Sequence, residues 1–221
     1  MQGPTGELFT EDVLQQRPGR EQIGQESYVL RGYALPWIDR VLPQLRGVLA
    51  QSPFRQMVTP GGFPLSAALS SCGELGWTTD STGYRYSPLD PRSQQPWPAM
   101  PDTLRQLAVL AAIEAGFCDF SPDACLINRY VPGAKMSLHQ DKNECNYSAP
   151  VVSVSLGMPA IFLFGGHARS DKPQRISLFH GDVVVWGGVD RLRFHGVMPI
   201  KEGVHSIMGP QRINLTFRTA G

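Results

Sequence analysis

The pattern of apolar and polar positions predicts two amphipathic helices in the first half of the chain. In residues 36–50 apolar side chains recur at helical spacing, and Pro43 inside this segment is expected to kink or split the helix. In residues 101–115 the spacing is clearer, with an apolar stripe that starts at Leu104 and with Gly116 as a stop signal. We expect both helices to pack against a sheet.

From Cys125 onward the pattern changes to short strands separated by Gly and Pro. One earlier short strand is expected at residues 30–32. The later strands are predicted at residues 125–130, 151–156, 161–164, 175–178, 182–186 and 212–218. Many short strands flanked by helices indicate a β-rich α+β protein, namely a double-stranded β-helix (jelly roll) with buttressing helices.

Two other segments differ in composition from this core. Residues 1–25 are polar, rich in Gln and Gly and without periodicity, so we expect a flexible N-terminal arm before a single domain at 26–221. Residues 53–98 combine six aromatic side chains with many Gly, Ser, Thr and Pro residues. We interpret this segment as a recognition lid over a functional site, and a hairpin that merely fills a gap in the core is the alternative.

Composition and charge exclude several classes of protein. With 221 residues, 42% apolar and 18% charged, the chain is typical of a globular protein. Its formal net charge of +1 excludes a strongly basic protein, so any nucleic-acid contact must come from a local patch. Four cysteines without a C-x-x-C pair are expected to be reduced thiols in a cytoplasmic protein. The uncharged segment 149–166 contains Pro and Gly, which argues against a membrane span.

Three residues have the spacing of a metal site. His139 and Asp141 are two positions apart, and His195 follows far downstream. Two imidazoles and one carboxylate can occupy one face of an octahedral metal and leave the opposite face open for a co-substrate and O₂, as in non-haem Fe(II) oxygenases. A zinc hydrolase that uses the same ligands is the alternative at this point.

The C-terminal strand strengthens the oxygenase interpretation. Side chains alternate across a strand, so Arg212, Asn214, Thr216 and Arg218 share one face, and the apolar residues between them share the other. Two guanidinium groups on one strand face suit bidentate binding of a dicarboxylate. A hydrolase has no obvious use for two such arginines, although a surface salt bridge remains the alternative for Arg212.

With these residues in view, the sequence resembles the AlkB family of Fe(II)- and 2-oxoglutarate-dependent nucleic-acid dealkylases. The resemblance extends from about Gln51 to Ala220 and leaves out the first 25 residues or so. The segments that carry it are 51–62 (QSPFRQMVTPGG), 75–79 (LGWTT), 96–101 (PWPAMP), 122–130 (PDACLINRY), 139–142 (HQDK), 152–157 (VSVSLG), 180–188 (HGDVVVWGG) and 214–218 (NLTFR).

The resemblance implies roles for the metal and co-substrate residues. It implies that His139, Asp141 and His195 bind Fe(II). It also implies that two arginines hold 2-oxoglutarate, with Arg218 at the distal carboxylate and Arg212 near the carboxylate that chelates iron. Further co-substrate hydrogen bonds are expected from Asn128, Tyr130 and Asn214.

The resemblance also implies that 53–98 is a nucleotide-recognition lid. Trp77 and Tyr84 match the positions that hold and stack a flipped base. The expected substrate contacts are Trp77, Tyr84, Asn143, Glu144, Arg169, Thr59 and Gly61. For the turn that contains Thr59 and Gly61, a solvated loop is the alternative.

One position departs from the pattern H-x-D-x-D-E of the bacterial members. Asn143 stands where they have a second aspartate near the exocyclic amine of the base. Asn143 keeps a carbonyl acceptor but loses the negative charge that favours a cationic methylated base. Glu144 is expected to compensate in part, and the preference between adenine and cytosine lesions is left open.

The activity implied by the resemblance is direct-reversal repair by oxidative demethylation. We expect a monomer that removes N-methyl groups from 1-methyladenine and 3-methylcytosine in single- or double-stranded DNA, and in RNA as a further substrate. Decarboxylation of 2-oxoglutarate with O₂ is coupled to hydroxylation of the methyl group, which leaves as formaldehyde. The alternatives are a 2-oxoglutarate oxygenase that acts on tRNA, protein or lipid, and a module that binds alkylated nucleic acid without turnover.

Overall fold

The alternating segment Arg212–Arg218 forms β13, a central strand of the larger of two sheets, in a computed structural model that describes residues 19–221. Its apolar residues Ile213, Leu215 and Phe217 pack into the core cluster that includes the helices. Its polar residues face the other way and line a pocket. The predicted division of this strand into an apolar and a polar face is therefore confirmed.

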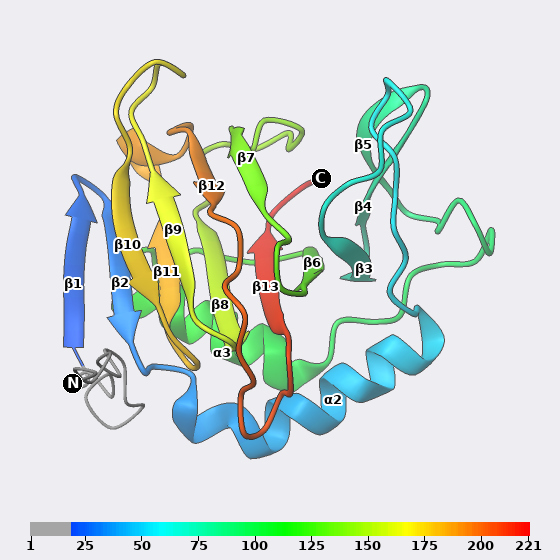
Figure 1. Cartoon of the computed structure of the whole chain (residues 1–221), viewed down its shortest axis with the longest axis horizontal. Coiled ribbons are helices and arrows are strands. Elements are labelled where there is room, and N and C mark those ends of the chain that lie inside the picture. The colour runs from blue at the N-terminus through cyan, green and yellow to red at the C-terminus, as the bar shows by residue number, and fades with distance from the viewer. Residues whose placement is uncertain (1–18) are drawn as a thin grey trace, which may run out of the picture.

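The strands form two antiparallel sheets and a separate hairpin (Figure 1). The seven-stranded sheet has the order β1-β2-β11-β8-β13-β6-β3, the four-stranded sheet has the order β10-β9-β12-β7, and β4 pairs with β5. The other bounds are β1 Gly19–Gly24, β2 Ser27–Arg31, β3 Ala68–Gly73, β4 Gly76–Asp80, β5 Gly83–Ser87, β6 Ala124–Tyr130, β7 Met136–His139, β8 Val151–Gly157, β9 Ala160–Phe164, β10 Gln174–Leu178, β11 Val183–Trp186 and β12 His195–Val197.

Two core clusters hold these layers together. One lies between the helices and the outer face of the seven-stranded sheet, and the second lies between the two sheets. The second includes Phe162 and Phe164 of β9 and Trp186 of β11. Two facing antiparallel sheets with helices on one side are consistent with the predicted jelly roll.

The helices match their predicted positions closely. α2 (Ile38–Gln51) follows a short 3₁₀ turn, η1 (Leu35–Trp37), and continues through Pro43 as one element. α3 (Asp102–Glu114) ends just before Gly116, whose φ of +98° suits glycine and stops the helix. A second 3₁₀ turn, η2 (Gly188–Asp190), precedes β12. None of the described helices is long and apolar enough to cross a membrane.

The structure corrects part of the predicted N-terminal arm. Residues 19–24 form β1, which pairs with β2 at the edge of the larger sheet, while residues 1–18 of the predicted arm lie outside the described residues. The first four residues of β1 are exposed. Because an edge strand exposed in this way shows no apolar alternation, the sequence pattern did not reveal it.

The segment 53–98 divides into two parts. β3 is the edge strand of the seven-stranded sheet, next to β6, and so belongs to the main fold. β4 and β5 form a separate two-stranded hairpin beside it (Figure 1). Trp97 is buried against Gly76 and donates a hydrogen bond to the Ser87 carbonyl. This aromatic side chain therefore fixes the hairpin and is not part of an exposed recognition surface.

Candidate metal centre and co-substrate pocket

Strand pairing brings the three predicted metal ligands together. β12 pairs with β7 in a register that places His195 directly opposite His139. Asp141 follows two residues after the end of β7. The ligand atoms of the three residues lie within 4.8 Å of one another, and this is the one cluster of three or more potential metal ligands found in residues 19–221.

Both imidazoles are oriented for metal binding by their own backbone. Nδ1 of His139 lies 3.0 Å from the Ser137 carbonyl oxygen, and Nδ1 of His195 lies 3.1 Å from the Arg193 carbonyl oxygen. A carbonyl accepts only from a protonated nitrogen, so Nε2 is the unprotonated nitrogen that can bind a metal. Burial and the neighbouring His139 lower the pKa of His195 to about 3, so this ligand is neutral at physiological pH.

Asp141 is ionised and held in place by Arg218. Burial alone would raise the pKa of this carboxyl, but Arg218 and the two histidines hold it well below its usual range. Arg218 donates to Asp141 Oδ2 from Nε at 2.9 Å and from Nη2 at 2.7 Å. Both of these bonds are on Oδ2, which leaves Oδ1 for a metal. Two Nε2 atoms and one carboxylate oxygen are a donor set that fits Fe(II).

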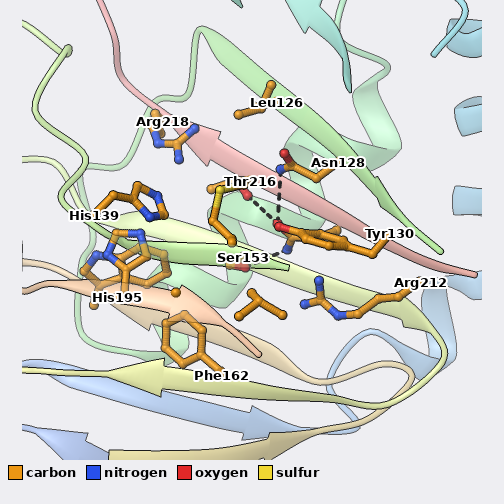
Figure 2. Close-up of a pocket in the computed structure, with 15 residues that line it drawn as sticks. Leu126, Asn128, Tyr130, His139, Ser153, Phe162, His195, Arg212, Thr216 and Arg218 are labelled. Carbon is orange, nitrogen blue, oxygen red and sulfur yellow. Dashed lines mark hydrogen bonds between the residues drawn. The ribbon is translucent and has the colours of Figure 1, made fainter. Parts of the chain in front are cut away.

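A pocket between the two sheets adjoins this cluster (Figure 2). The polar face of β13 forms one wall, and Phe162, His195 and Val197 of the smaller sheet contribute to the other. Arg212 is 1% exposed, yet its Nε and Nη1 have no hydrogen-bond partner among the described residues. A buried guanidinium without a counter-charge is costly, so Arg212 fits a carboxylate of 2-oxoglutarate.

The two arginines lie at opposite ends of the pocket, in an order that does not agree with their expected roles. Arg218 lies beside the histidines and binds the metal ligand Asp141, whereas Arg212 lies at the opposite end of the pocket (Figure 2). Arg218, and not Arg212, therefore lies at the metal end of the pocket. The sequence pattern could not decide this, because alternation places both side chains on one face without saying which end of the strand lies at the metal.

The other predicted co-substrate residues differ in their availability. Asn128 and Tyr130 line the pocket, and Asn128 Oδ1 is buried without a partner. The Tyr130 ring lies 5.3 Å from the Arg212 guanidinium carbon and helps to fix it. Asn214 also lines the pocket, but its amide donates to Ser153 Oγ and Val154 O and accepts from Thr216. Asn214 therefore mainly braces the strand.

The predicted base-binding aromatics lie on one face of the β4–β5 hairpin. The rings of Trp77 and Tyr84 are stacked, with centroids 5.7 Å apart and an interplanar angle of 22°. Trp77 is half-buried against the cluster between the sheets, and Tyr84 is 45% exposed. Tyr86 lies directly opposite Trp77 in the hairpin.

The remaining predicted substrate residues are mostly at the surface. Asn143 and Arg169 are exposed, and Arg169 lies over the Phe194 ring at 5.9 Å. Thr59 and Gly61 form a tight turn, in which Thr59 Oγ1 accepts a hydrogen bond from the Phe63 N–H. The structure brings none of these four into the pocket between the sheets.

Glu144 is the exception, because its side chain is buried and already has partners within the protein. Its side chain is turned inward, where Oε1 accepts a hydrogen bond from the Tyr86 hydroxyl at 2.8 Å. The same oxygen lies 3.3 Å from Arg218 Nε, and Oε2 lies 3.3 Å from Arg191 Nη2. The sequence analysis missed Arg191 because a single charged residue in a turn carries no periodic signal. The ion pairs with two buried guanidiniums account for the inward position of the Glu144 carboxylate.

The chain is similar in sequence to known oxygenases. A family model described as the 2OG-Fe(II) oxygenase superfamily matches residues 37–218. The chain is 54% identical over 204 residues to the alpha-ketoglutarate-dependent dioxygenase AlkB of Escherichia coli, which covers 92% of this chain and 94% of that protein. The chain belongs to the AlkB family. Like its family, it is an Fe(II)- and 2-oxoglutarate-dependent dioxygenase.

More distant similarities agree with the family assignment. An AlkB homolog of Caulobacter vibrioides is 44% identical over 171 residues and covers 77% of this chain and 76% of its own. The solved structure of OsALKBH1 superposes with a TM-score of 0.76 at 28% identity and covers 90% of this chain and 99% of that one. An oxidoreductase of the 2OG-Fe(II) oxygenase family from Burkholderia pseudomallei shares the fold, with a TM-score of 0.55 at 14% identity over 90% of this chain and 92% of that one.

Proposed function

We propose that this enzyme demethylates 1-methyladenine and 3-methylcytosine in single- or double-stranded DNA, and in RNA as a further substrate. The observation that carries the proposal is the combination of the His139, Asp141 and His195 cluster with a buried, unpaired Arg212 in the adjoining pocket. Activity on alkylated bases follows from membership of the AlkB family. The choice of these two lesions rests on the resemblance to the bacterial members.

The pocket residues hold the co-substrate in a fixed direction. Arg212 binds the distal carboxylate, because its two free donors form a charge-assisted pair with it. Asn128 and Tyr130 lie on the same wall and complete the contacts. When bound, iron and 2-oxoglutarate together activate O₂ for hydroxylation of the methyl group. Asp141 stays ionised throughout, because Arg218 stabilises its negative charge.

The β4–β5 hairpin supplies the base-binding part. A methyl group on N1 of adenine or N3 of cytosine lies on the Watson–Crick edge, which a duplex hides, so the base must be single-stranded or flipped out. Trp77 and Tyr84 offer exposed aromatic surface for stacking, which contributes about 1–3 kcal/mol per base without distinguishing bases. This sequence tolerance suits an enzyme that accepts both a purine and a pyrimidine.

We propose that the protein is a monomer in the cytoplasm. All four cysteines are free thiols, which agrees with a reducing compartment. Size-exclusion chromatography with light scattering gives the oligomeric state directly, and a dimer would contradict this part of the proposal.

The first experiment is mass spectrometry of methylated oligonucleotides incubated with the protein, Fe(II), ascorbate, 2-oxoglutarate and air. We expect loss of the methyl group from 1-methyladenine and from 3-methylcytosine, dependent on 2-oxoglutarate and absent in the Asp141→Ala variant. If 2-oxoglutarate is consumed and neither base changes, the substrate assignment is wrong while the oxygenase assignment stands. The alternative of an oxygenase for tRNA, protein or lipid would then be tested with those substrates.

A further inference from the structure

A buried network of four charged side chains and one tyrosine connects the base-binding hairpin with the metal ligand Asp141. Starting from the hairpin, its members are Tyr86, Glu144, Arg191, Arg218 and Asp141. The Glu144 and Arg191 side chains are each 2% exposed, and those of Arg218 and Asp141 are 7% and 8% exposed. Two carboxylates face two guanidiniums, so the buried charges balance.

The contacts in this network form a continuous path. The Tyr86 hydroxyl donates to Glu144 Oε1 at 2.8 Å, and the same oxygen lies 3.3 Å from Arg218 Nε. Arg218 in turn donates twice to Asp141 Oδ2. A second branch runs through Arg191, which pairs with Glu144 Oε2 and donates from Nη1 to the Asp141 backbone carbonyl at 2.8 Å.

Asp141 depends on these contacts because its own segment has no regular structure. β7 ends at His139 and β8 begins at Val151, and the residues between form neither helix nor strand. The Asp141 side chain is fixed by Arg218 and its carbonyl by Arg191. Both guanidiniums also form ion pairs with Glu144 at 3.3 Å. Glu144 is therefore the shared partner of the two arginines that contact Asp141.

Tyr86 connects this network to the surface that meets the base. In the β4–β5 register, Trp77 lies directly opposite Tyr86, and Tyr84 lies diagonally across from Trp77. Cross-strand neighbours of this kind share one face of a hairpin and contact each other. Burial raises the pKa of Tyr86 well above its usual range, so its hydroxyl keeps the proton that it donates to Glu144. The Tyr86 hydroxyl is therefore a direct contact between the hairpin and Glu144.

We propose that Tyr86 and Glu144 are positioning residues that couple the base-binding hairpin to the orientation of the metal ligand Asp141. Neither residue touches the reacting atoms. Through these two residues, the Asp141 carboxylate takes the orientation that binds the metal when the hairpin is packed against Glu144. This inference rests on the proposed function in one respect, namely that the hairpin holds a methylated base.

Two conservative variants test this coupling. Tyr86→Phe keeps the ring and removes the hydroxyl, and Glu144→Gln keeps the size and an acceptor oxygen but removes the charge. The matched control is Tyr147→Phe, which removes a hydroxyl that donates to the Lys142 carbonyl in the same segment. Each protein is compared with the native one by Co(II) titration without iron, by thermal unfolding, and by the ratio of formaldehyde released to succinate formed.

For Tyr86→Phe we expect a fall of about tenfold in kcat for the methylated oligonucleotide, with an unchanged KM, because a hydrogen bond to a charged acceptor is lost. The ratio of formaldehyde to succinate should fall as well. For Glu144→Gln we expect Co(II) affinity to fall at least about tenfold, since the two arginines that orient Asp141 then lose the charge of their shared partner. The double variant should resemble Glu144→Gln alone, and Tyr147→Phe should match the native protein.

Other outcomes would overturn the inference. If Tyr86→Phe raised only the KM for the oligonucleotide, Tyr86 would be a substrate contact. If both variants lowered the melting temperature and left Co(II) affinity and the product ratio unchanged, the network would be merely structural. The Co(II) titration of Glu144→Gln needs no methylated base, so this part of the inference can be judged even if the proposed substrates prove wrong.

Discussion

At the scale of single residues, the two arginines of β13 show how one residue type serves two purposes in one pocket. Arg218 has a fixed partner in Asp141, and this nearby negative charge raises its pKa further although burial alone would lower it. Arg212 lacks such a partner, and burial lowers its pKa. A guanidinium stays protonated even so, which leaves Arg212 in need of an anion. Arg218 therefore braces the metal ligand, and Arg212 is available for the proposed contact with the co-substrate.

Substitution of each arginine should therefore affect a different binding event. We expect Arg212→Met to raise the KM for 2-oxoglutarate by about 30-fold or more, since charge-assisted hydrogen bonds of about 2 kcal/mol are lost. Its Co(II) affinity should stay close to that of the native protein. Arg218→Met should instead weaken Co(II) binding, because Asp141 loses both donors that orient it.

Steady-state kinetics at varied 2-oxoglutarate, together with metal titration of each variant, separates the two roles. A larger effect of Arg218→Met on the KM for 2-oxoglutarate, with metal affinity unchanged, would instead support Arg218 as the residue that binds the distal carboxylate.

At the scale of elements, the end of β8 shows how closely the backbone is packed behind the pocket. Gly157 has a φ of +90° and lies opposite Arg212 in the β8–β13 register. A Cβ atom there would lie 2.4 Å from the Gln211 carbonyl oxygen. Its N–H also donates to His180 Nδ1 at 2.9 Å. Only glycine fits this position, which neighbours the residue that precedes Arg212.

Gly157→Ala is expected to destabilise the protein and to disturb co-substrate binding. The strained backbone costs about 1–3 kcal/mol, and the movement of β13 should raise the KM for 2-oxoglutarate. The control is Gly47→Ala in α2, where a Cβ would meet nothing within 4 Å. That change should stabilise the helix by about 0.5–1 kcal/mol. Urea denaturation measures the free energy of unfolding of both variants. Equal changes in the two variants would contradict the prediction that a side chain is tolerated at position 47 but not at position 157.

At the scale of the whole molecule, stability should depend on pH through a histidine outside the metal site. Burial, together with the neighbouring His205, lowers the pKa of His180 to about 4 from its ordinary value near 6.5. Between these two pH values the unfolded chain binds a proton that the folded chain does not bind. Acidification through this window therefore favours unfolding. The loss of stability caused by His180 levels off below about pH 4.

We expect the free energy of unfolding to fall more steeply between pH 6.5 and 4 in the native protein than in His180→Asn. An asparagine can still accept the Gly157 hydrogen bond but does not titrate. Urea denaturation at a series of pH values, with a chelator present to remove the effect of metal, gives the two curves. Parallel curves would show that His180 contributes no such dependence.

Local features of this protein could be predicted from the sequence because their physical cause is local. The alternation in Arg212–Arg218 predicted an apolar face and an arginine face, because side chains of a strand point to opposite sides at every second residue. The spacing around Leu104 and the stop at Gly116 predicted α3 for a similar reason. The ligand set of His139, Asp141 and His195 followed from residue type and family pattern.

The way in which these parts face one another depends on contacts between segments far apart in the sequence. Short strands such as β7 and β12 carry too few residues for a periodic signal, yet their pairing sets His139 opposite His195. Which arginine lies at the metal depends on the direction of β13 relative to β7, and no local pattern encodes that direction. Glu144 turned inward because two distant arginines meet there, and a buried charge follows its partners wherever the fold places them.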